Sequence, residues 1–114
     1  MSKFEEKVEM YYKDLTEKLK VKKVDRELLT KVTKGVGPNI YKVDASKVSS
    51  SDKDEMGRVK KNFCMKKLGM TDEAKVDAAI EKVIDTIGKS NKSKYRATFY
   101  YLLVKELGKE SVYN

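Results

Sequence analysis

The chain has 114 residues, with 26 Lys and Arg against 18 Asp and Glu, so its formal net charge is +8 at pH 7. It has no histidine, which excludes histidine-based catalytic triads, a histidine general base and histidine metal sites. Its one cysteine excludes a disulfide framework and a cysteine-based structural zinc site. The length fits one domain spanning residues 1–114, and such a chain buries about two-thirds of its extended surface on folding.

The sequence predicts no membrane-spanning segment. Its longest apolar run, Phe99–Val104, has six residues, whereas a spanning helix needs roughly 20. The first residues, Met1–Lys7, are polar and include Glu5 and Glu6, unlike the apolar centre of a signal peptide. A single unpaired cysteine suits a reducing compartment. We therefore expect a cytoplasmic protein that makes no membrane contact.

The first predicted helix spans residues 2–20. Its apolar side chains fall on one stripe about 100° wide, as in a helix that packs one face against a core. The residues of this stripe are Phe4, Val8, Tyr11, Tyr12, Leu15 and Leu19. Ser2 followed by Glu5 is the pattern of an N-terminal capping box, which places the start of the helix.

The second predicted helix, residues 25–34, begins with Asp25 as its N-terminal cap. We expect Gly35 to end it, because glycine adopts the left-handed conformation that closes many helices, and Pro38 prevents its continuation. A short turn over residues 39–44 follows. Two of its side chains are expected to pack inward, Ile40 and Tyr41.

The third predicted helix, about residues 52–68, is capped by Ser51 or Asp52 and is apolar on two faces. One face carries Met56, Val59 and Phe63, and the other carries Cys64, Met65 and Leu68. A helix that is apolar on two faces usually packs against neighbours on both. We therefore expect this helix to lie between other elements.

The last two predicted helices span about residues 72–87 and 93–107. Thr71 is expected to cap the first, and Ser90 or Asn91 the second. The first has a single apolar stripe of Val76, Ala79, Ile80, Val83, Ile84 and Ile87. The second is apolar around most of its circumference, which predicts the central and most buried helix. Its one continuous polar strip consists of Lys94, Thr98 and Lys105.

No segment alternates in the pattern of a β-strand, and no linker or internal repeat divides the chain. Four of the predicted helices end at a glycine, namely Gly35, Gly69, Gly88 and Gly108. The sequence therefore predicts an all-α fold, a compact single-domain bundle of about five helices with short, glycine-terminated connections.

The positive charge is unevenly distributed along the chain. Residues 1–57 carry 13 basic and 11 acidic side chains, whereas residues 58–114 carry 13 and 7. Clustered cations can neutralise phosphates, so the second half contains candidate nucleic-acid contacts. These are Arg58, Lys60, Lys61, Lys67, Lys92, Lys94 and Arg96. A solvated surface explains the same charges, because they spread around the helices and 23 of the 26 cations are lysine rather than arginine.

Other patterns have plainer explanations than the chemistry they suggest. Residues 71–107 read as helix, turn and helix, which describes a DNA-binding helix-turn-helix but also most antiparallel helix pairs. Gly35–Ile40 lacks the third glycine and the preceding strand of a dinucleotide-binding loop. Cys64 has lysines nearby that could lower its pKa, yet a mid-helix cysteine is usually a small buried hydrophobe. We find no catalytic, metal or cofactor constellation and predict that the protein is not an enzyme.

Several blocks of the chain resemble a known family. The blocks are Arg58–Phe63, Lys66–Gly69, Ser90–Ala97 and Phe99–Glu106, together with Gly37-Pro38 and Gly108–Val112. They are similar to a small bacterial family of uncharacterised, all-helical proteins of about this length, classed as a domain of unknown function. The resemblance implies a single-domain bacterial protein, and it supplies no activity, cofactor or catalytic residue.

The sequence therefore favours a non-enzymatic protein-interaction module that binds a protein partner or a second copy of itself. The alternative is a non-specific nucleic-acid-binding protein that uses the basic C-terminal half. Binding that falls steeply with salt would distinguish the second function from the first.

Overall fold

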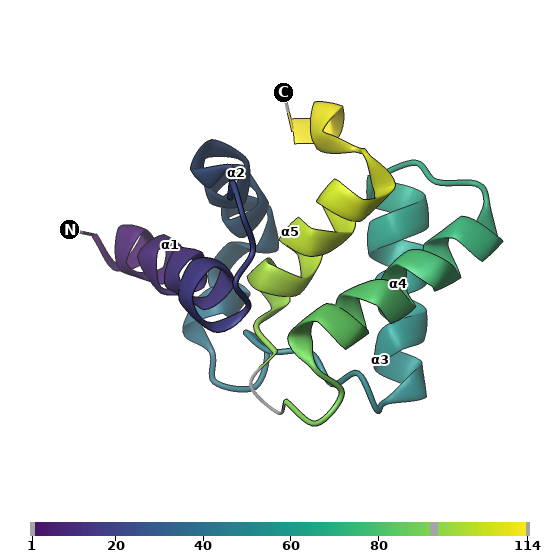
Figure 1. Cartoon of the computed structure of the whole chain (residues 1–114), viewed down its shortest axis with the longest axis horizontal. Helices are drawn as coiled ribbons and strands as arrows, with labels where there is room; N and C mark the ends of the chain where they lie inside the picture. Colours follow the sequence, from purple (N-terminus) through teal and green to yellow (C-terminus); the bar gives the residue numbers. More distant parts are fainter. Residues whose placement is uncertain (1, 92–93, 114) are drawn as a thin grey trace.

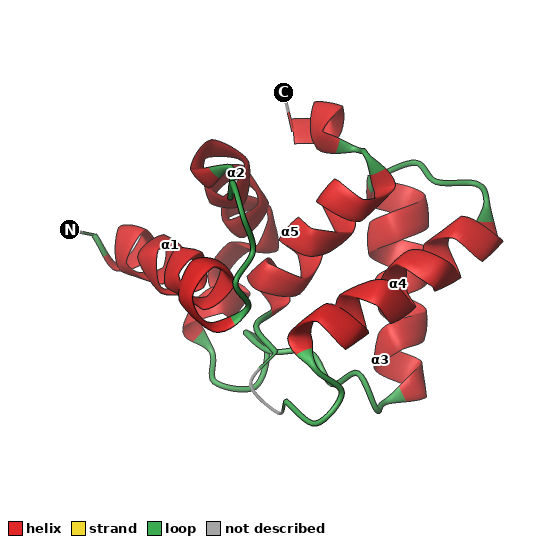
Figure 2. Ribbon diagram, viewed as in Figure 1, coloured by secondary structure: helices red, strands yellow, loops and turns green. Residues whose placement is uncertain are grey.

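The computed structural model describes residues 2–91 and 94–113, in which the backbone forms five α-helices and no β-strand (Figure 1, Figure 2). The helices are α1 (Lys3–Lys13), α2 (Arg26–Val36), α3 (Lys53–Arg58), α4 (Glu73–Ile87) and α5 (Arg96–Leu107). α5 lies at the centre, with α2 packed on one side and α4 on the other (Figure 1). The predicted all-α bundle is confirmed, including the central place of the last helix.

α1 starts at the capping box that the sequence predicts. The Glu5 amide donates to the Ser2 hydroxyl at 3.1 Å, and the Ser2 amide donates to the Glu5 carboxylate at 3.3 Å. The helix then widens into a π-helical turn, Asp14–Lys18. Because the predicted stripe faces the core, Tyr11 and Leu15 are fully buried.

α2 ends two residues later than predicted. Asp25 caps it as expected, because its carboxylate accepts a hydrogen bond from a first-turn amide at 3.0 Å. Gly35 remains helical, however, and the residue that leaves the helix is Gly37, with a φ of 79°. The reason is Pro38, since a proline disfavours the helical conformation at the residue before it. The prediction that Gly35 ends this helix is therefore wrong.

A short 3-10 turn, Gly37–Tyr41, follows α2. Ile40 is buried as predicted, but Tyr41 is 48% exposed, which corrects the expectation that both pack inward. Neighbouring residues of a 3-10 turn point about 120° apart, so a buried Ile40 directs Tyr41 away from the core. Val43, two residues further on, is 79% exposed.

α3 begins at Asp52, one of the two predicted caps, whose carboxylate accepts from the amides of Asp54 and Glu55. It continues without a break into a π-helical stretch, Val59–Lys67. Both predicted apolar faces pack inward, with Val59, Phe63, Cys64 and Leu68 buried and Met56 and Met65 partly buried. The third helix therefore lies between neighbours, as its two apolar faces indicate.

The caps predicted for the last two helices are wrong. Asp72, rather than Thr71, caps α4, because its carboxylate accepts a hydrogen bond from a first-turn amide at 3.2 Å. Neither Ser90 nor Asn91 caps α5, which begins after Tyr95 without a side-chain capping bond. The predicted start of this helix at residue 93 lies outside the described residues.

Two residues of the polar strip predicted for the last helix are buried. Thr98 is fully buried, because α5 has neighbours on both sides. Lys94 is only 3% exposed, and its ammonium donates to the backbone carbonyls of Lys89 and Asn91. Only Lys105 is exposed as expected.

Candidate functional site

A cavity of about 630 Å³ opens between the loop of residues 43–51 and the residues just before α5. We call it the polar cleft. It is lined by Val43, Asp44, Lys47, Val48, Ser49, Ser50, Ser51, Glu55, Lys89, Ser90, Asn91, Lys94 and Arg96. Its volume falls within the range of about 300–1,000 Å³ typical of ligand-binding pockets.

The two walls of the polar cleft are joined by backbone pairing. Residues 46–48 and 94–96 form an isolated antiparallel bridge, although about 50 residues of chain separate them. This pairing holds the backbone of Tyr95 extended, and α5 begins at the next residue, Arg96. The hydrogen bonds are Val48 N–H to Lys94 O at 2.8 Å and Arg96 N–H to Ser46 O at 2.7 Å.

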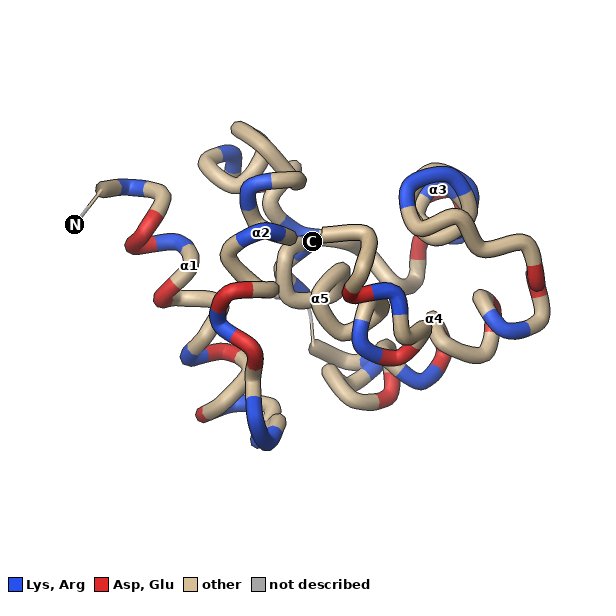
Figure 3. The backbone as a smooth tube through the Cα atoms, turned by 90° about the horizontal axis from the view of Figure 1, so that it is seen from above, with Lys and Arg blue, Asp and Glu red and all other residues tan. Residues whose placement is uncertain are grey.

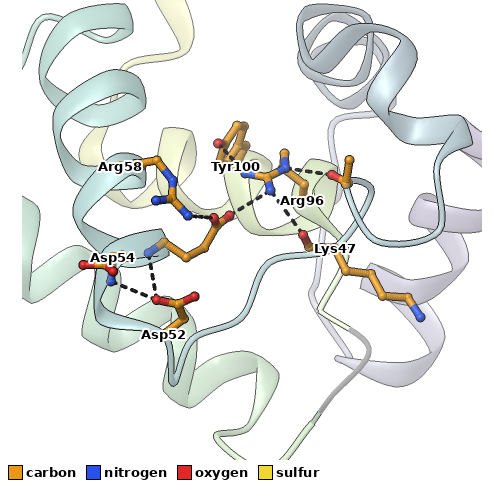
Figure 4. A network of polar contacts seen from close by, with 8 residues as sticks. Lys47, Asp52, Asp54, Arg58, Arg96 and Tyr100 are labelled. Atoms are coloured by element: carbon orange, nitrogen blue, oxygen red, sulfur yellow. Dashed lines mark hydrogen bonds and ion pairs between the residues drawn. The ribbon is translucent and has the colours of Figure 1, made fainter.

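Arg96 donates hydrogen bonds to four other residues of the site (Figure 4). Its guanidinium donates to the Glu55 carboxylate at 2.7 Å and to the Tyr100 hydroxyl at 3.1 Å. It also donates to the carbonyls of Ala45 at 3.0 Å and Lys47 at 3.2 Å. Arg96 therefore ties the loop, α3 and α5 together through one side chain.

The Glu55 carboxylate is held between two guanidinium groups. Arg58 donates to it at 2.8 Å from the same helix, and Arg96 approaches it from α5 (Figure 4). Burial alone would raise the pKa of Glu55, but the hydrogen bonds and charges of Arg58 and Arg96 lower it by more. The side chains of Arg96 and Glu55 are only 19% and 14% exposed, so the pair is a tightly held element of the cleft wall.

Of the other cations that line the cleft, Lys94 is already hydrogen-bonded to backbone carbonyls of the protein. Burial lowers the pKa of Lys94, and its ammonium is surrounded by backbone carbonyls. The Lys47 ammonium lies 6.0 Å from the centre of the Tyr95 ring, and the Lys89 ammonium lies 3.9 Å from the Asp85 carboxylate. These longer contacts leave Lys47 and Lys89 able to bind an anionic group that enters the cleft.

Two exposed apolar side chains lie in the chain segment that leads into the polar cleft. Val43 lines the cleft, and Tyr41 precedes it by two residues. The Ser46 hydroxyl donates to the Val43 carbonyl at 3.1 Å, and the Ser46 amide donates to the Lys42 carbonyl at 3.0 Å. Tyr41 and Val43 are therefore presented by an ordered turn rather than by a free loop.

A family model described as "Protein of unknown function (DUF2853)" matches residues 10–111 of the chain. The protein belongs to this family. The resemblance to an uncharacterised family of unknown function is thereby confirmed, as is the helical fold that it implies. No curated protein matches the sequence.

In this member of the DUF2853 family, most of the predicted nucleic-acid contacts face other residues of the chain. Arg58 and Arg96 share the Glu55 carboxylate, and Lys94 is buried. Lys60 forms ion pairs with two carboxylates of α4, at 3.1 and 3.0 Å.

Neither Lys61 nor Lys67 lines the polar cleft. The Lys67 ammonium lies 5.5 Å from the centre of the Tyr113 ring. Lys61 is exposed and forms no ion pair with the described residues. Lys92 lies outside the described residues. Among the members of this set that the structure describes, only Lys94 and Arg96 come together in the polar cleft.

Sequence reasoning missed most of the polar cleft. Lys47, Lys89 and the serines at 49–51 carry no recognisable spacing, because the bridge that brings them together joins distant residues. Glu55 was detectable only as one of the acidic residues near a helix start, a pattern that capping explains. Its pairing with Arg96, 41 residues later, has no local signal.

Other sites considered from the sequence have a simple structural description. Cys64 is fully buried, and burial raises the pKa of its thiol to about 12, which keeps it un-ionised at neutral pH. Over residues 2–91 and 94–113, no group of three or more Cys, Asp or Glu could hold a metal ion. Within the same residues, no helix is long and apolar enough to span a membrane.

Proposed function

We propose that this protein is a non-enzymatic protein-interaction module and that its docking site is the polar cleft with Val43 in its wall and Tyr41 just before it in the chain. The observation that carries the proposal is the exposure of these two apolar side chains, 48% and 79%, on an ordered turn beside a basic cavity. Aromatic side chains are enriched among the anchors of protein interfaces, and the rim around such anchors is polar and accessible to solvent.

The fixed backbone of the cleft wall favours binding. The bridge of residues 46–48 with 94–96 and the Arg96–Glu55 pair hold the wall in place before a partner arrives. A preordered site loses less conformational entropy on binding than a mobile loop does. The partner that fits presents an acidic group to Lys47 and Lys89 and an apolar side chain to Val43.

A distinct partner fits this site better than a second copy of the chain. The chain has a net charge of +8, so two copies repel one another, whereas an acidic partner is attracted. Nucleic-acid binding by the C-terminal half is less favoured, because six of its 13 cations are paired with carboxylates. These six are Arg58, Lys60, Lys82, Lys89, Arg96 and Lys105.

Charge reversal tests the proposed site. Immobilised wild-type protein is compared with the cleft variant K47E/K89E and with a matched control, K75E/K109E, whose lysines lie outside the cleft. We expect proteins that bind both the wild type and the control in cell extracts to be lost from the cleft variant. Equal recovery by all three proteins contradicts the docking site, and light scattering that shows a stable dimer assigns the site to a second copy.

A further inference from the structure

The connection between α1 and α2 carries four exposed lysines, Lys18, Lys20, Lys22 and Lys23, which we call the lysine turn. In Figure 3, a stretch of blue marks the tip where the chain passes from α1 to α2. None of the four lysines forms an ion pair with the carboxylates that the structure describes. The lysine turn therefore forms no ion pair there, unlike much of the more basic C-terminal half, although the charge of Lys18 acts on the nearby buried carboxyl of Asp14.

The backbone of the lysine turn is fixed at both ends. The Val21 amide donates to the Leu15 carbonyl at 2.9 Å, and the Asp25 amide donates to the Tyr101 hydroxyl of α5 at 2.8 Å. The apolar residues of the segment, Leu19, Val21 and Val24, pack against the core. As the apolar side chains point inward, the lysines are left facing the solvent.

Two of these lysines occupy the conformation that glycine usually takes. Lys20 has a φ of 57° and Lys23 a φ of 56°. Every other positive-φ residue in the described part of the chain is a glycine, namely Gly37, Gly69, Gly88 and Gly108. A side chain in this region costs free energy, and such strained residues concentrate at functional sites. Lysine at these two positions adds positive charge to the turn, whereas glycine would add none.

We propose that the lysine turn binds the phosphate backbone of nucleic acid without regard to base sequence. A phosphate backbone needs only positive charge at its surface. Protein interfaces, by contrast, are depleted in lysine and depend on aromatic or arginine anchors, which the lysine turn lacks. Binding to a membrane surface usually adds apolar insertion, and the apolar side chains of this segment face the core.

The dimensions of the turn suit this ligand. Six residues span at most about 20 Å, and that length of duplex carries about 12 phosphates. Four phosphate contacts give a slope of about −3.6 in the plot of log affinity against log salt. The affinity for duplex DNA should thus fall about 150-fold between about 50 and 200 mM salt.

Fluorescence anisotropy with a short labelled duplex, measured over this salt range, tests the proposal. The wild type is compared with K18Q/K20Q/K22Q/K23Q and with a control, K61Q/K66Q/K75Q/K109Q, whose lysines also lack ion pairs. Both variants lower the net charge from +8 to +4. A third variant with arginine at positions 18, 20, 22 and 23 keeps the charge, and circular dichroism checks that each protein folds.

We expect the glutamine variant of the lysine turn to lose the salt-dependent affinity and the control and the arginine variant to keep it. Equal weakening of the two glutamine variants would mean that net charge alone drives binding. Loss of the salt-dependent affinity in K61Q/K66Q/K75Q/K109Q alone would assign binding to the C-terminal half. Binding to anionic phosphatidylserine vesicles but not to the duplex would assign the turn to membranes. Each of these three results overturns the proposal.

Discussion

At the scale of single residues, Tyr11 is a buried polar group at an apolar position. It is fully buried, its ring centre lies 5.3 Å from that of Tyr95, and its hydroxyl has no hydrogen-bond partner in the described part of the chain. Burial raises the pKa of Tyr11 to about 12. A buried hydroxyl without a partner loses its hydration and gains nothing in return.

Tyr11→Phe should therefore raise the free energy of unfolding by about 1 kcal/mol at pH 7, measured by urea denaturation. The advantage should grow above pH 10, because Tyr11 then ionises in the unfolded chain but not in the folded one. At about pH 11 the added difference is about 1.4 kcal/mol. As a control, Tyr12→Phe, on a partly exposed side chain, should change stability by less than about 0.5 kcal/mol. A destabilised Tyr11→Phe protein would show that the hydroxyl does have a partner.

At the scale of elements, helix starts and helix ends each followed local rules in part. Ser2, Asp25 and Asp52 cap their helices as the sequence predicts, because capping bonds join residues only two or three apart. The end of α2 depended on the competition between Gly35 and Gly37. Two glycines so close together leave the end ambiguous unless the effect of Pro38 on the preceding residue is considered.

Alanine at these two glycines tests that helix end. Gly37→Ala should lower the free energy of unfolding by about 1–3 kcal/mol, because Gly37 has a φ of 79°. Gly35→Ala should raise it by about 0.5–1 kcal/mol, since Gly35 is helical and an added Cβ meets only Tyr113, at 3.7 Å. Thermal unfolding followed by circular dichroism measures both, and the opposite order of stability would place the helix end at Gly35.

The ion pair between Glu55 of α3 and Arg96 of α5 also belongs to the scale of elements. Glu55→Gln leaves Arg96 without its carboxylate and should lower the free energy of unfolding by about 2 kcal/mol above pH 4.5. The loss should disappear as the pH falls below 4.5, because the pKa of Glu55 is lowered in the folded protein and its protonation removes the same charge. Glu73→Gln, at an exposed ion pair, is the control and should cost less than about 1 kcal/mol. Equal losses in the two variants would contradict the role assigned to this pair.

The candidate site was less predictable than the fold, for a physical reason. Helical spacing and caps are local, so the five helices could be found from the sequence. The polar cleft depends on the pairing of Lys47 with Tyr95 and of Glu55 with Arg96, which are distant in the chain. Tyr41, expected in the core, is instead exposed, since Ile40 takes the buried position.

At the scale of the whole molecule, the net charge is +8, and the cations available for binding are not concentrated in the half of the sequence that is more basic. The C-terminal half has the larger excess of cations, yet much of that charge is paired or buried. The cations that form no ion pair with the described carboxylates include the lysine turn between α1 and α2 and Lys47 of the polar cleft, where Lys89 is paired with Asp85 only at 3.9 Å. These two regions are the basis of the two proposed binding activities.

Site-specific photo-crosslinking in cells tests the proposed docking site most directly. A benzophenone amino acid replaces Val43 in the wall of the polar cleft or, as a control, the exposed Thr86 of α4. The account predicts a discrete crosslinked protein from position 43 that is absent from position 86 and is lost when K47E/K89E is added. Crosslinks of the same pattern from both positions, or crosslinks from position 43 that persist in K47E/K89E, would contradict it.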